Sequence, residues 1–359
     1  MTGTSLDAVD AALVNFSKTS CELIETLELA LPAELRERLL KLIDKPHEVS
    51  LDELGNAGRE LALLYAEAVN QLLHSAQIKA DTVHAIGCHG QTIRHQPDSE
   101  PAFTLQIGDA ATLAAATGIT TIADFRSADI ALGGQGAPLA PLFHQWWLRS
   151  INRTGAVINI GGIANISIVA PDQPVIGFDT GPGNTLLDVW CNACTGENFD
   201  LNGTWAAQGQ LIPELLDSML ADSYMLLPPP KSTGREYFNK DWLDWQIRTA
   251  GTDAKPVDIQ ATLAEFTAIS IAQAITSYAP GTVIWLCGGG TANTDLVRRI
   301  RTQCADSAVN STDALGIPAA WIEATAFAWL ARQRLNQQPI ETPSVTGASR
   351  DALLGAIYQ

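Results

Sequence analysis

The chain has 359 residues, of which 46% are hydrophobic and 17% charged, so it can bury a large core and its length favours about two domains. With 22 Lys and Arg against 39 Asp and Glu, its net charge of −17 repels phosphate backbones and anionic lipid, which excludes nucleic acid and membrane surfaces as expected partners. No secretory signal or membrane-spanning run is recognisable, and several of the six cysteines lie in apolar runs, so a reducing cytoplasmic location is expected.

The first part of the chain alternates apolar strands with amphipathic helices. Strands are predicted at residues 11–16, 21–29, 83–88, 103–107 and 119–123. Helices are predicted at residues 32–43, 50–78, 109–117 and 139–149. The glycine-rich motif Gly133-Gly134-Gln135-Gly136-Ala137-Pro138 interrupts this pattern and places a boundary between two lobes near residues 135–150.

The second part of the chain opens with a strand-rich block at Gly155. Strands are predicted at residues 156–160, 164–169, 175–178 and 283–287. Helices are predicted at residues 185–195, 204–221, 258–278, 293–304 and 319–335. This alternation predicts an α/β fold with mixed sheets flanked by helices. We expect two lobes, residues 1–140 and 141–359, in which the C-terminal segment can pack back on the first lobe.

Four segments share one form, in which an apolar strand is followed by a glycine turn and then by a hydroxyl or amide residue. They are residues 3–7, 159–165, 178–184 and 287–293. Glycine lets backbone N–H groups approach a phosphate, and ligands of open α/β sheets collect at the carboxyl ends of strands. The turns therefore favour phosphate binding, although glycine turns are also common in α/β proteins of other functions.

Other nucleotide-binding motifs are missing from the sequence. No G-x-x-x-x-G-K-[ST] occurs, and Lys231-Ser232-Thr233-Gly234 follows three prolines rather than a glycine loop, so a P-loop is excluded. No dinucleotide fingerprint lies in a βαβ unit, and the His and Cys spacing is not that of a metal site. What remains is a phosphate held between glycine hairpins of two lobes, the arrangement of actin-like ATPases and sugar kinases.

Taken together, the motifs resemble those of the anhydro-N-acetylmuramic acid kinase family over nearly the whole chain. The motifs that carry the resemblance are residues 3–10, 87–92, 106–109, 124–126, 133–138, 159–165, 177–184, 229–236, 287–290, 323–330 and 343–348. Two departures stand out. Family members carry a short apolar strand ahead of Gly3, so the first strand is expected to be shortened here, and Ala8 replaces a glycine of the family.

The resemblance implies two actin-like (ribonuclease H-like) lobes with an active-site cleft between them. It implies an ATP-dependent sugar kinase that uses Mg²⁺, phosphorylates 1,6-anhydro-N-acetylmuramic acid and hydrolyses its anhydro bridge, in peptidoglycan recycling. The partners would be ATP, an amino sugar and a second copy of the chain in a homodimer. Two alternatives stay open: another sugar or acid kinase of the actin fold, and a non-catalytic actin-like ATP-binding protein.

Asp179 and Glu323 are the expected catalytic residues. Asp179 ends an apolar strand directly before a glycine turn, where a carboxylate can act as the general base. Capping of the helix that begins near Pro182 is the alternative role. Glu323 opens the last amphipathic helix and is expected to position the sugar or water, or simply to favour the helix dipole.

The resemblance also implies which residues bind ATP. The expected residues are Gly3, Thr4, Ser5, Leu6, Asp7, Ala8, Val9, Asp10, Gly161, Gly162, Gly288, Gly289, Gly290 and Asn293. Within this set, Gly3, Thr4, Ser5, Gly161 and Gly162 would grip the phosphates, and Gly288, Gly289, Gly290 and Asn293 would lie against adenosine. Asp7 and Asp10 would hold Mg²⁺ through water, with a solvated acidic turn as the alternative.

The lactyl carboxylate of a muramic acid calls for a guanidinium partner, and Arg126 is the best candidate. A structural contact between Asp124 and Arg126 is the alternative. The full set of expected substrate-binding residues is His89, Asp124, Arg126, Thr180, Gly181 and Asn184. A structural role is equally compatible with the histidines His89 and His95.

Overall fold

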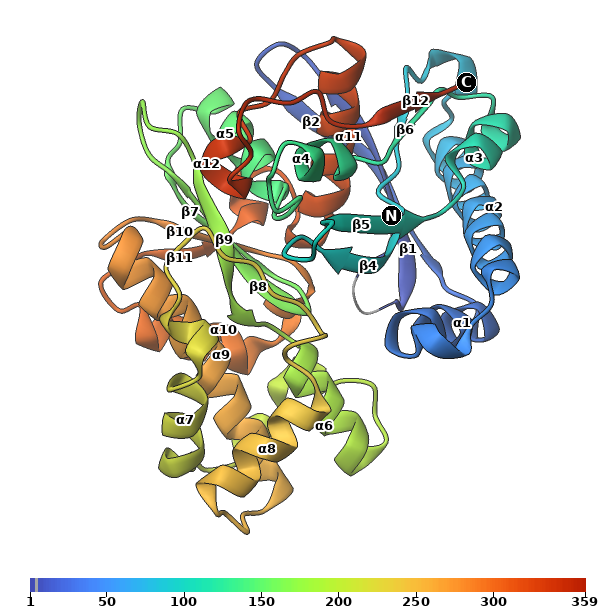
Figure 1. The fold of residues 1–359 in the computed structure, drawn as a ribbon. Helices are drawn as coiled ribbons and strands as arrows, with labels where there is room; N and C mark the ends of the chain where they lie inside the picture. The colour runs from blue at the N-terminus through green and yellow to red at the C-terminus, as the bar shows by residue number, and fades with distance from the viewer. Residues whose placement is uncertain (4–5) are drawn as a thin grey trace. The chain divides into compact units, whose positions relative to one another are not determined.

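The computed structural model describes residues 1–3 and 6–359 and divides the chain into two compact units. Unit 1 comprises Met1–Ile151 and Trp321–Gln359, and unit 2 comprises Asn152–Ala320. Each unit combines strands and helices, which confirms the predicted α/β class with mixed sheets (Figure 1). Helix α5 (Ala140–Ser150) belongs to unit 1, although the prediction placed most of it in the second lobe.

Unit 2 is built on a five-stranded sheet of order β11-β10-β7-β8-β9. Strands β7 (Gly155–Ile160), β8 (Ile163–Val169) and β9 (Ile176–Pro182) form an antiparallel meander. Strands β10 (Ile284–Cys287) and β11 (Val309–Ser311) continue the sheet in parallel with β7. This strand order is the one expected of a ribonuclease H-like lobe.

The sheet of unit 2 is covered by helices. All six residues of β7 are buried, as expected of a central strand with both faces covered. Helix α9 (Pro256–Tyr278) packs on β8 and β9, and its buried residues lie on every side because other helices pack around it. Those helices are α6 (Thr185–Thr195), α7 (Pro213–Leu220) and α10 (Thr294–Gln303) (Figure 1). Helix α8 (Lys240–Ala250) packs on α6 and α7, and its Trp242 ring stacks on Phe266 of α9.

Unit 1 begins with the antiparallel hairpin of β1 (Ala8–Phe16) and β2 (Cys21–Ala30). The long helix α2 (Leu51–Ala76) packs against both strands, and α1 (Ala33–Asp44) packs on α2 (Figure 1). Helix α2 starts with a complete capping box, in which Ser50 and Glu53 each accept the backbone N–H of the other. The apolar core of unit 1 includes Leu6, Val9, Leu39, Leu61 and Leu113.

The rest of unit 1 consists of short strands and helices. Strand β12 (Ala356–Tyr358) pairs antiparallel with β6 (Thr121–Ala123), which pairs in parallel with β3 (Ile86–Gly87), so the C-terminus is tied into unit 1. The remaining elements are β4 (Gln91–Gln96), β5 (Phe103–Ile107), α3 (Ala110–Thr117), α4 (Ser127–Ala131), α11 (Ile322–Leu335) and α12 (Pro343–Thr346).

The helix predicted at residues 204–221 is wrong as a single element. The chain forms a 3-10 turn at Ala206–Gln208 and then helix α7 from Pro213. The break lies at Gly209, where a side chain would come within 2.2 Å of the Val257 carbonyl oxygen, and proline starts the next helix. Helix α8 was not predicted, although Asn239 caps its start and Gly251 ends it with a φ of 62°.

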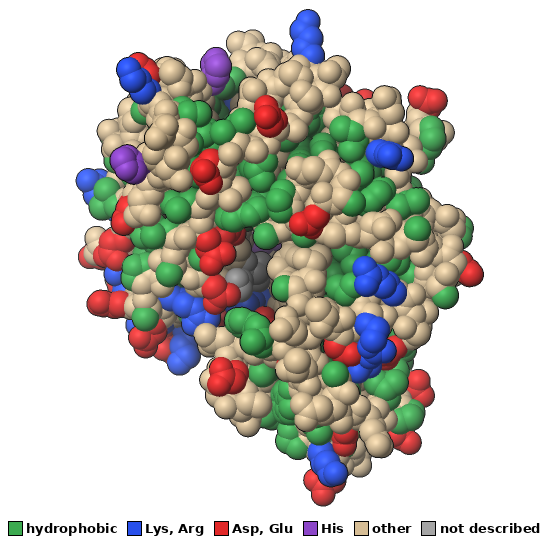
Figure 2. Space-filling model, turned by 180° about the vertical axis from the view of Figure 1, so that it is seen from behind, with side chains coloured by type: hydrophobic (Ala, Val, Ile, Leu, Met, Phe, Trp, Pro, Cys, Tyr) green, Lys and Arg blue, Asp and Glu red, His purple; other side chains and the backbone are tan. Residues whose placement is uncertain are grey.

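On the face shown in Figure 2, acidic and basic side chains are interspersed, and the acidic side chains do not gather in one patch. Among the helices of the described residues, none combines the length and the apolar composition that spanning a bilayer requires.

Candidate active site

Asp179 lies in the edge strand β9 and only 8% of its surface is exposed. The pairing register shifts beside it, because Ala164 faces Gly181 whereas Asn165 faces Asp179. Thr180 is therefore the extra residue of a β-bulge, and its hydroxyl donates to the Ala164 carbonyl at 3.2 Å. Bulges re-aim neighbouring side chains and are frequent beside active sites. The bulge thus sets the direction of the predicted base.

Residues 224–233, which we call the strap, make three hydrogen bonds with Asp179. The Thr233 N–H donates to Oδ2 of Asp179 at 3.0 Å. The Asp179 N–H donates to the Lys231 carbonyl at 3.1 Å, and the Tyr224 hydroxyl donates to the Asp179 carbonyl at 2.8 Å. The helix-capping alternative does not describe this geometry, since the N-cap residue of α6 is Asn184.

The turn between β7 and β8 contains Gly161 and Gly162 and lies on the start of helix α6. The Gly161 carbonyl accepts the Asn184 N–H at 2.8 Å, and the Gly162 carbonyl accepts those of Gly183 and Thr185 at 2.8 and 3.0 Å. A side chain at Gly183 would lie 2.3 Å from the Gly161 oxygen, so glycine is required for this contact. These contacts fix the glycine hairpin on the start of α6, and they occupy the backbone N–H groups of residues 183–185.

The glycines of the predicted adenosine motif have different surroundings. A Cβ at Gly288 would lie 2.2 Å from Oδ1 of Asn159, and one at Gly290 would lie 2.3 Å from Ile160 Cγ2. These two glycines therefore let the turn pack on the end of β7. Around Gly289 nothing lies within 4 Å among the described residues, so this glycine alone has space on its side-chain side. Asn293 caps α10 by accepting the Leu296 N–H at 2.9 Å.

The first phosphate segment is described only in part, because the predicted residues Thr4 and Ser5 lie outside the described residues. Gly3 is partly exposed, and its carbonyl accepts the Leu6 N–H at 3.2 Å. Leu6 is fully buried with a φ of 57°, and its carbonyl accepts a hydrogen bond from Arg36. The Leu6 side chain belongs to the core, so only its backbone remains for a phosphate.

Residues 7–10 lead from this segment into β1. Asp7 is exposed, with Oδ1 3.7 Å from an Arg36 guanidinium nitrogen. Ala8 pairs with Ala30 and has no positive φ, so the replacement of glycine at this position causes no backbone strain. The Val9 side chain is buried in the core of unit 1, so only its backbone could contact a nucleotide.

Asp10 lies near other acidic side chains and near the N-terminal ammonium group, which donates to its carbonyl at 2.8 Å. Burial raises the pKa of Asp10 to about 6; the ammonium group opposes this change, whereas the carboxylates of Glu28, directly opposite on β2, and Glu323 add to it. Glu323 lies in the first turn of α11, within unit 1, whereas Asp179 belongs to unit 2. Among the described residues there is no group of three or more His, Cys, Asp or Glu that could hold a metal directly. A partly buried carboxylate with acidic neighbours fits a cation held through water.

His89 and Arg126 form a partly buried pair in unit 1. Two guanidinium nitrogens of Arg126 lie 3.2 and 3.0 Å from Nε2 of His89, and Nδ1 of His89 lies 3.0 Å from the Gly90 carbonyl. Burial, with the Arg126 charge second, lowers the pKa of His89 well below its ordinary value, so the ring is neutral and accepts at Nε2. His89 therefore orients Arg126, whose third nitrogen donates to the Gly136 carbonyl at 2.6 Å.

The neighbours of Arg126 include two further polar residues. Nδ1 of His95 lies 3.1 Å from the Thr104 hydroxyl oxygen, and which of the two donates depends on the tautomer of the ring. Burial lowers the pKa of His95 to about 4. Asp124 is exposed with a φ of 56°, and its carboxylate accepts the Ser127 N–H at 3.4 Å. These contacts leave the substrate-binding roles of Arg126, Asp124 and His89 as predictions.

Several residues of the site carried no prediction from the sequence. Tyr224, Lys231 and Thr233 contact Asp179, and Asp129 holds the glycine loop at residues 133–136 in place. Asp129 is fully buried and accepts the Gly136 N–H and the Thr346 hydroxyl, both at 2.7 Å. Asp129 lies in an apolar stretch directly before the glycine motif, and this pattern in the sequence could have identified it.

Comparison with known proteins identifies relatives along the whole chain. A sequence model described as anhydro-N-acetylmuramic acid kinase matches residues 1–359. The anhydro-N-acetylmuramic acid kinase of Coxiella burnetii (strain Dugway 5J108-111) is 48% identical over 361 residues, covering 100% of this chain and 96% of the relative. That of Saccharophagus degradans (strain 2-40 / ATCC 43961 / DSM 17024) is 46% identical, covering 100% of this chain and 97% of the relative.

Likeness to solved structures is more distant. Component A of the (R)-2-hydroxyglutaryl-CoA dehydratase of Acidaminococcus fermentans overlaps with a TM-score of 0.46 and 11% identity, over 89% of this chain and 96% of that chain. The five-stranded sheet of unit 2, with glycine turns after β7 and β10 and the buried Asp179 on β9, has the features that the sequence predicts for a chain of the actin-like ATPase and sugar kinase class. This chain belongs to the anhydro-N-acetylmuramic acid kinase family.

Proposed function

We propose that this kinase uses ATP to phosphorylate 1,6-anhydro-N-acetylmuramic acid while opening its anhydro bridge, which yields N-acetylmuramic acid 6-phosphate in peptidoglycan recycling. The family match along the whole chain supports the substrate. The observation that supports the chemistry is Asp179, a nearly buried carboxylate at a β-bulge whose backbone and Oδ2 are both held by hydrogen bonds. Such a carboxylate is suited to general-base catalysis.

In the proposed reaction Asp179 takes a proton from a water molecule as that water attacks C1 of the sugar. The C1–O6 bond breaks, and O6 forms a bond to the γ-phosphorus of ATP while the bond to the leaving ADP oxygen breaks. The proton on Asp179 is then released to solvent. The Thr233 N–H at 3.0 Å fixes the orientation of the carboxylate during this transfer.

Other residues take supporting roles in the proposal. Glu323 positions the sugar or the water, and Arg126 receives the lactyl carboxylate of the sugar. Mg²⁺, bound through water to Asp10 and Asp7, would compensate phosphate charge in a chain whose net charge is −17. The phosphates of ATP contact the segment at residues 3–10 and the turn of Gly161 and Gly162. Gly181 and Asn184 lie beside the bulge and contact the sugar together with Thr180.

We infer further that the chain works as a cytoplasmic homodimer. The family resemblance supports the dimer. All six cysteines are free, which agrees with a reducing compartment.

The test is to incubate the protein with ATP, Mg²⁺ and the anhydro sugar in H₂¹⁸O and to analyse the products by mass spectrometry. We expect ADP and one equivalent of sugar 6-phosphate, with the label on C1 and none in the phosphate. The C1 label is read at early times, before the free anomer exchanges with the solvent. Phosphorylation of N-acetylglucosamine at a comparable rate would instead indicate an ordinary hexokinase-like enzyme. ATP binding without formation of any sugar phosphate would favour a non-catalytic actin-like protein.

A further inference from the structure

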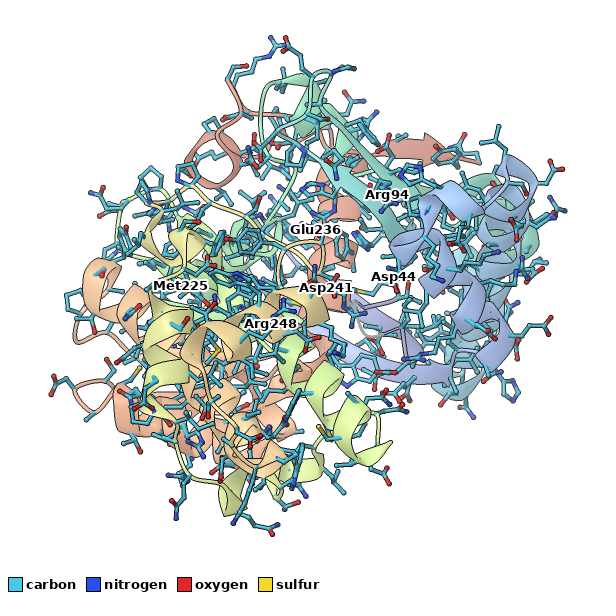
Figure 3. All side chains as sticks on the ribbon, turned by 60° about the horizontal axis from the view of Figure 1, so that its bottom comes forward. Asp44, Arg94, Met225, Glu236, Asp241 and Arg248 are labelled. Carbon is cyan, nitrogen blue, oxygen red and sulfur yellow. The ribbon has the colours of Figure 1, made fainter. Side chains whose placement is uncertain are left out.

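The strap, residues 224–233, contacts Asp179 at three separate groups. It supplies a partner for the backbone N–H, the backbone carbonyl and the carboxylate of this one residue. Met225, labelled in Figure 3, also packs beside the bulge, since a Cβ at Gly181 would lie 3.6 Å from its sulfur. Three directional contacts on one residue fix both the position and the rotation of its side chain.

Tyr224 anchors the strap to the core of unit 2. Its ring is 5% exposed and packs edge-on against Phe238, with ring centroids 5.5 Å apart. Asp222 accepts the Tyr224 N–H at 2.9 Å and also the Trp242 indole N–H at 2.9 Å. Burial, with the Asp179 charge second, raises the pKa of Tyr224, so its hydroxyl stays protonated and donates to Asp179.

Lys231 closes the strap on itself. Its ammonium group donates to the Tyr224 carbonyl at 3.1 Å and lies 4.6 Å from the centre of the Tyr224 ring. Burial lowers the pKa of Lys231, while the Asp179 carboxylate opposes this change. A half-buried lysine costs stability, and here its charge lies close to the carboxylate that the strap holds.

We propose that the strap positions Asp179 for catalysis and that Tyr224 and Lys231 are positioning residues for the base. The inference rests on the proposed function, because it takes Asp179 as the base. Misplacement of a catalytic group by even about 1 Å can cost a large factor in rate, so loosening the strap should lower kcat more than it weakens ATP binding. A purely structural role would instead change stability and leave kcat per folded molecule unchanged.

The experiment measures kcat, the KM for ATP and the melting temperature of four variants of the full chain. Tyr224→Phe removes only the hydroxyl that contacts Asp179, and we expect about a tenfold lower kcat with an unchanged KM for ATP. Lys231→Met should lower kcat similarly, and Lys231→Arg should recover part of it. Tyr358→Phe is the control for loss of a tyrosine hydroxyl, because Tyr358 lies in β12 of unit 1, outside the strap. We expect wild-type kcat from this control.

A second measurement combines Tyr224→Phe with Asp179→Asn. If the strap acts through the base, the double variant turns over as slowly as Asp179→Asn alone. Wild-type kcat in Tyr224→Phe, or an equal loss in both backgrounds, would overturn the positioning role while leaving the kinase assignment intact. Absence of the sugar 6-phosphate with wild-type protein would overturn both.

Discussion

Two poorly exposed carboxylates differ sharply at the scale of single residues. Asp179 is surrounded by donors, receiving a backbone N–H on its carboxylate and a phenol hydroxyl on its carbonyl. Asp10 has the acidic residues Glu28 and Glu323 near it, together with the N-terminal ammonium group. The first environment orients a group for chemistry, whereas in the second burial and the two acidic neighbours favour binding of a proton or a cation. These surroundings support the assignment of the first carboxylate to proton transfer and of the second to Mg²⁺.

The raised pKa of Asp10, about 6, predicts a dependence of stability on pH. Because the folded-state pKa lies above the unfolded value, ionised Asp10 destabilises the fold at pH above about 6, and the penalty disappears as pH falls towards the unfolded pKa of about 4. Asp10→Asn should therefore stabilise the protein at pH 8 by on the order of 1 kcal/mol, and by less at pH 5.

Thermal unfolding at the two pH values without Mg²⁺ tests this expectation. Asp44→Asn is the matched control, since Asp44 is exposed at the end of α1 and is labelled in Figure 3. A difference in melting temperature between Asp10→Asn and wild type that is the same at pH 5 and pH 8 would contradict the proposed environment of Asp10.

Arg126 predicts a substrate-specific effect. Arg126→Lys keeps the positive charge but loses the planar fork that binds a carboxylate through two parallel bonds. We expect the KM for the anhydromuramic substrate to rise about tenfold, in proportion to a lost charge-assisted hydrogen bond of roughly 1.4 kcal/mol. The control substrate is 1,6-anhydro-N-acetylglucosamine, which lacks the lactyl group. An equal rise of KM for both sugars would mean that Arg126 supports the fold through His89 and Gly136 rather than binding the lactyl carboxylate.

At the scale of elements, turns decide where ligands can approach. The turn after β10 packs two of its three glycines, Gly288 and Gly290, on the end of β7, and leaves open space only around Gly289. The turn after β7 is fixed by the first residues of α6. Both turns follow strands of one sheet, so packing within unit 2 sets their geometry before any nucleotide binds.

The contrast within the β10 turn gives a prediction for the adenosine assignment. Gly289→Ala adds a methyl group where there is space among the described residues, so stability should not change. If adenosine lies against this turn, the KM for ATP should rise severalfold. Gly288→Ala should instead lower the melting temperature, because its φ of 84° and the nearby Ile160 carbonyl do not accommodate a side chain. An unchanged KM for ATP in Gly289→Ala would remove the turn from the nucleotide site.

At the scale of the whole molecule, apolar runs were the reliable signal. Strand β5 (Phe103–Ile107) and helix α6 (Thr185–Thr195) have the predicted bounds because continuous apolar or amphipathic patterns define them. Helix α8 escaped prediction because charged and polar residues dilute its apolar face, although Asn239 and Gly251 mark its ends. The break at Gly209 depends on contact with Val257, far along the chain, which no local pattern reveals.

In the candidate site too, local patterns could be predicted from the sequence and contacts between distant segments could not. Asp179 could be predicted because a carboxylate between an apolar strand and a glycine turn is a local pattern. The strap could not be predicted as its partner, since the contact uses the backbone N–H of Thr233 and the hydroxyl of Tyr224. A backbone donor has no signature in the sequence, and the contact with Asp179 forms only when residues 224–233 fold back against β9.

The measurement that tests the account most directly is the turnover of Asp179→Asn with ATP, Mg²⁺ and the anhydro sugar. Asparagine preserves the shape of the side chain but cannot accept the proton of the attacking water, so we expect kcat to fall by about a thousandfold. The melting temperature should stay within a few degrees of wild type, which shows that the fold persists. A folded Asp179→Asn protein that forms the sugar 6-phosphate at close to the wild-type rate would contradict the account.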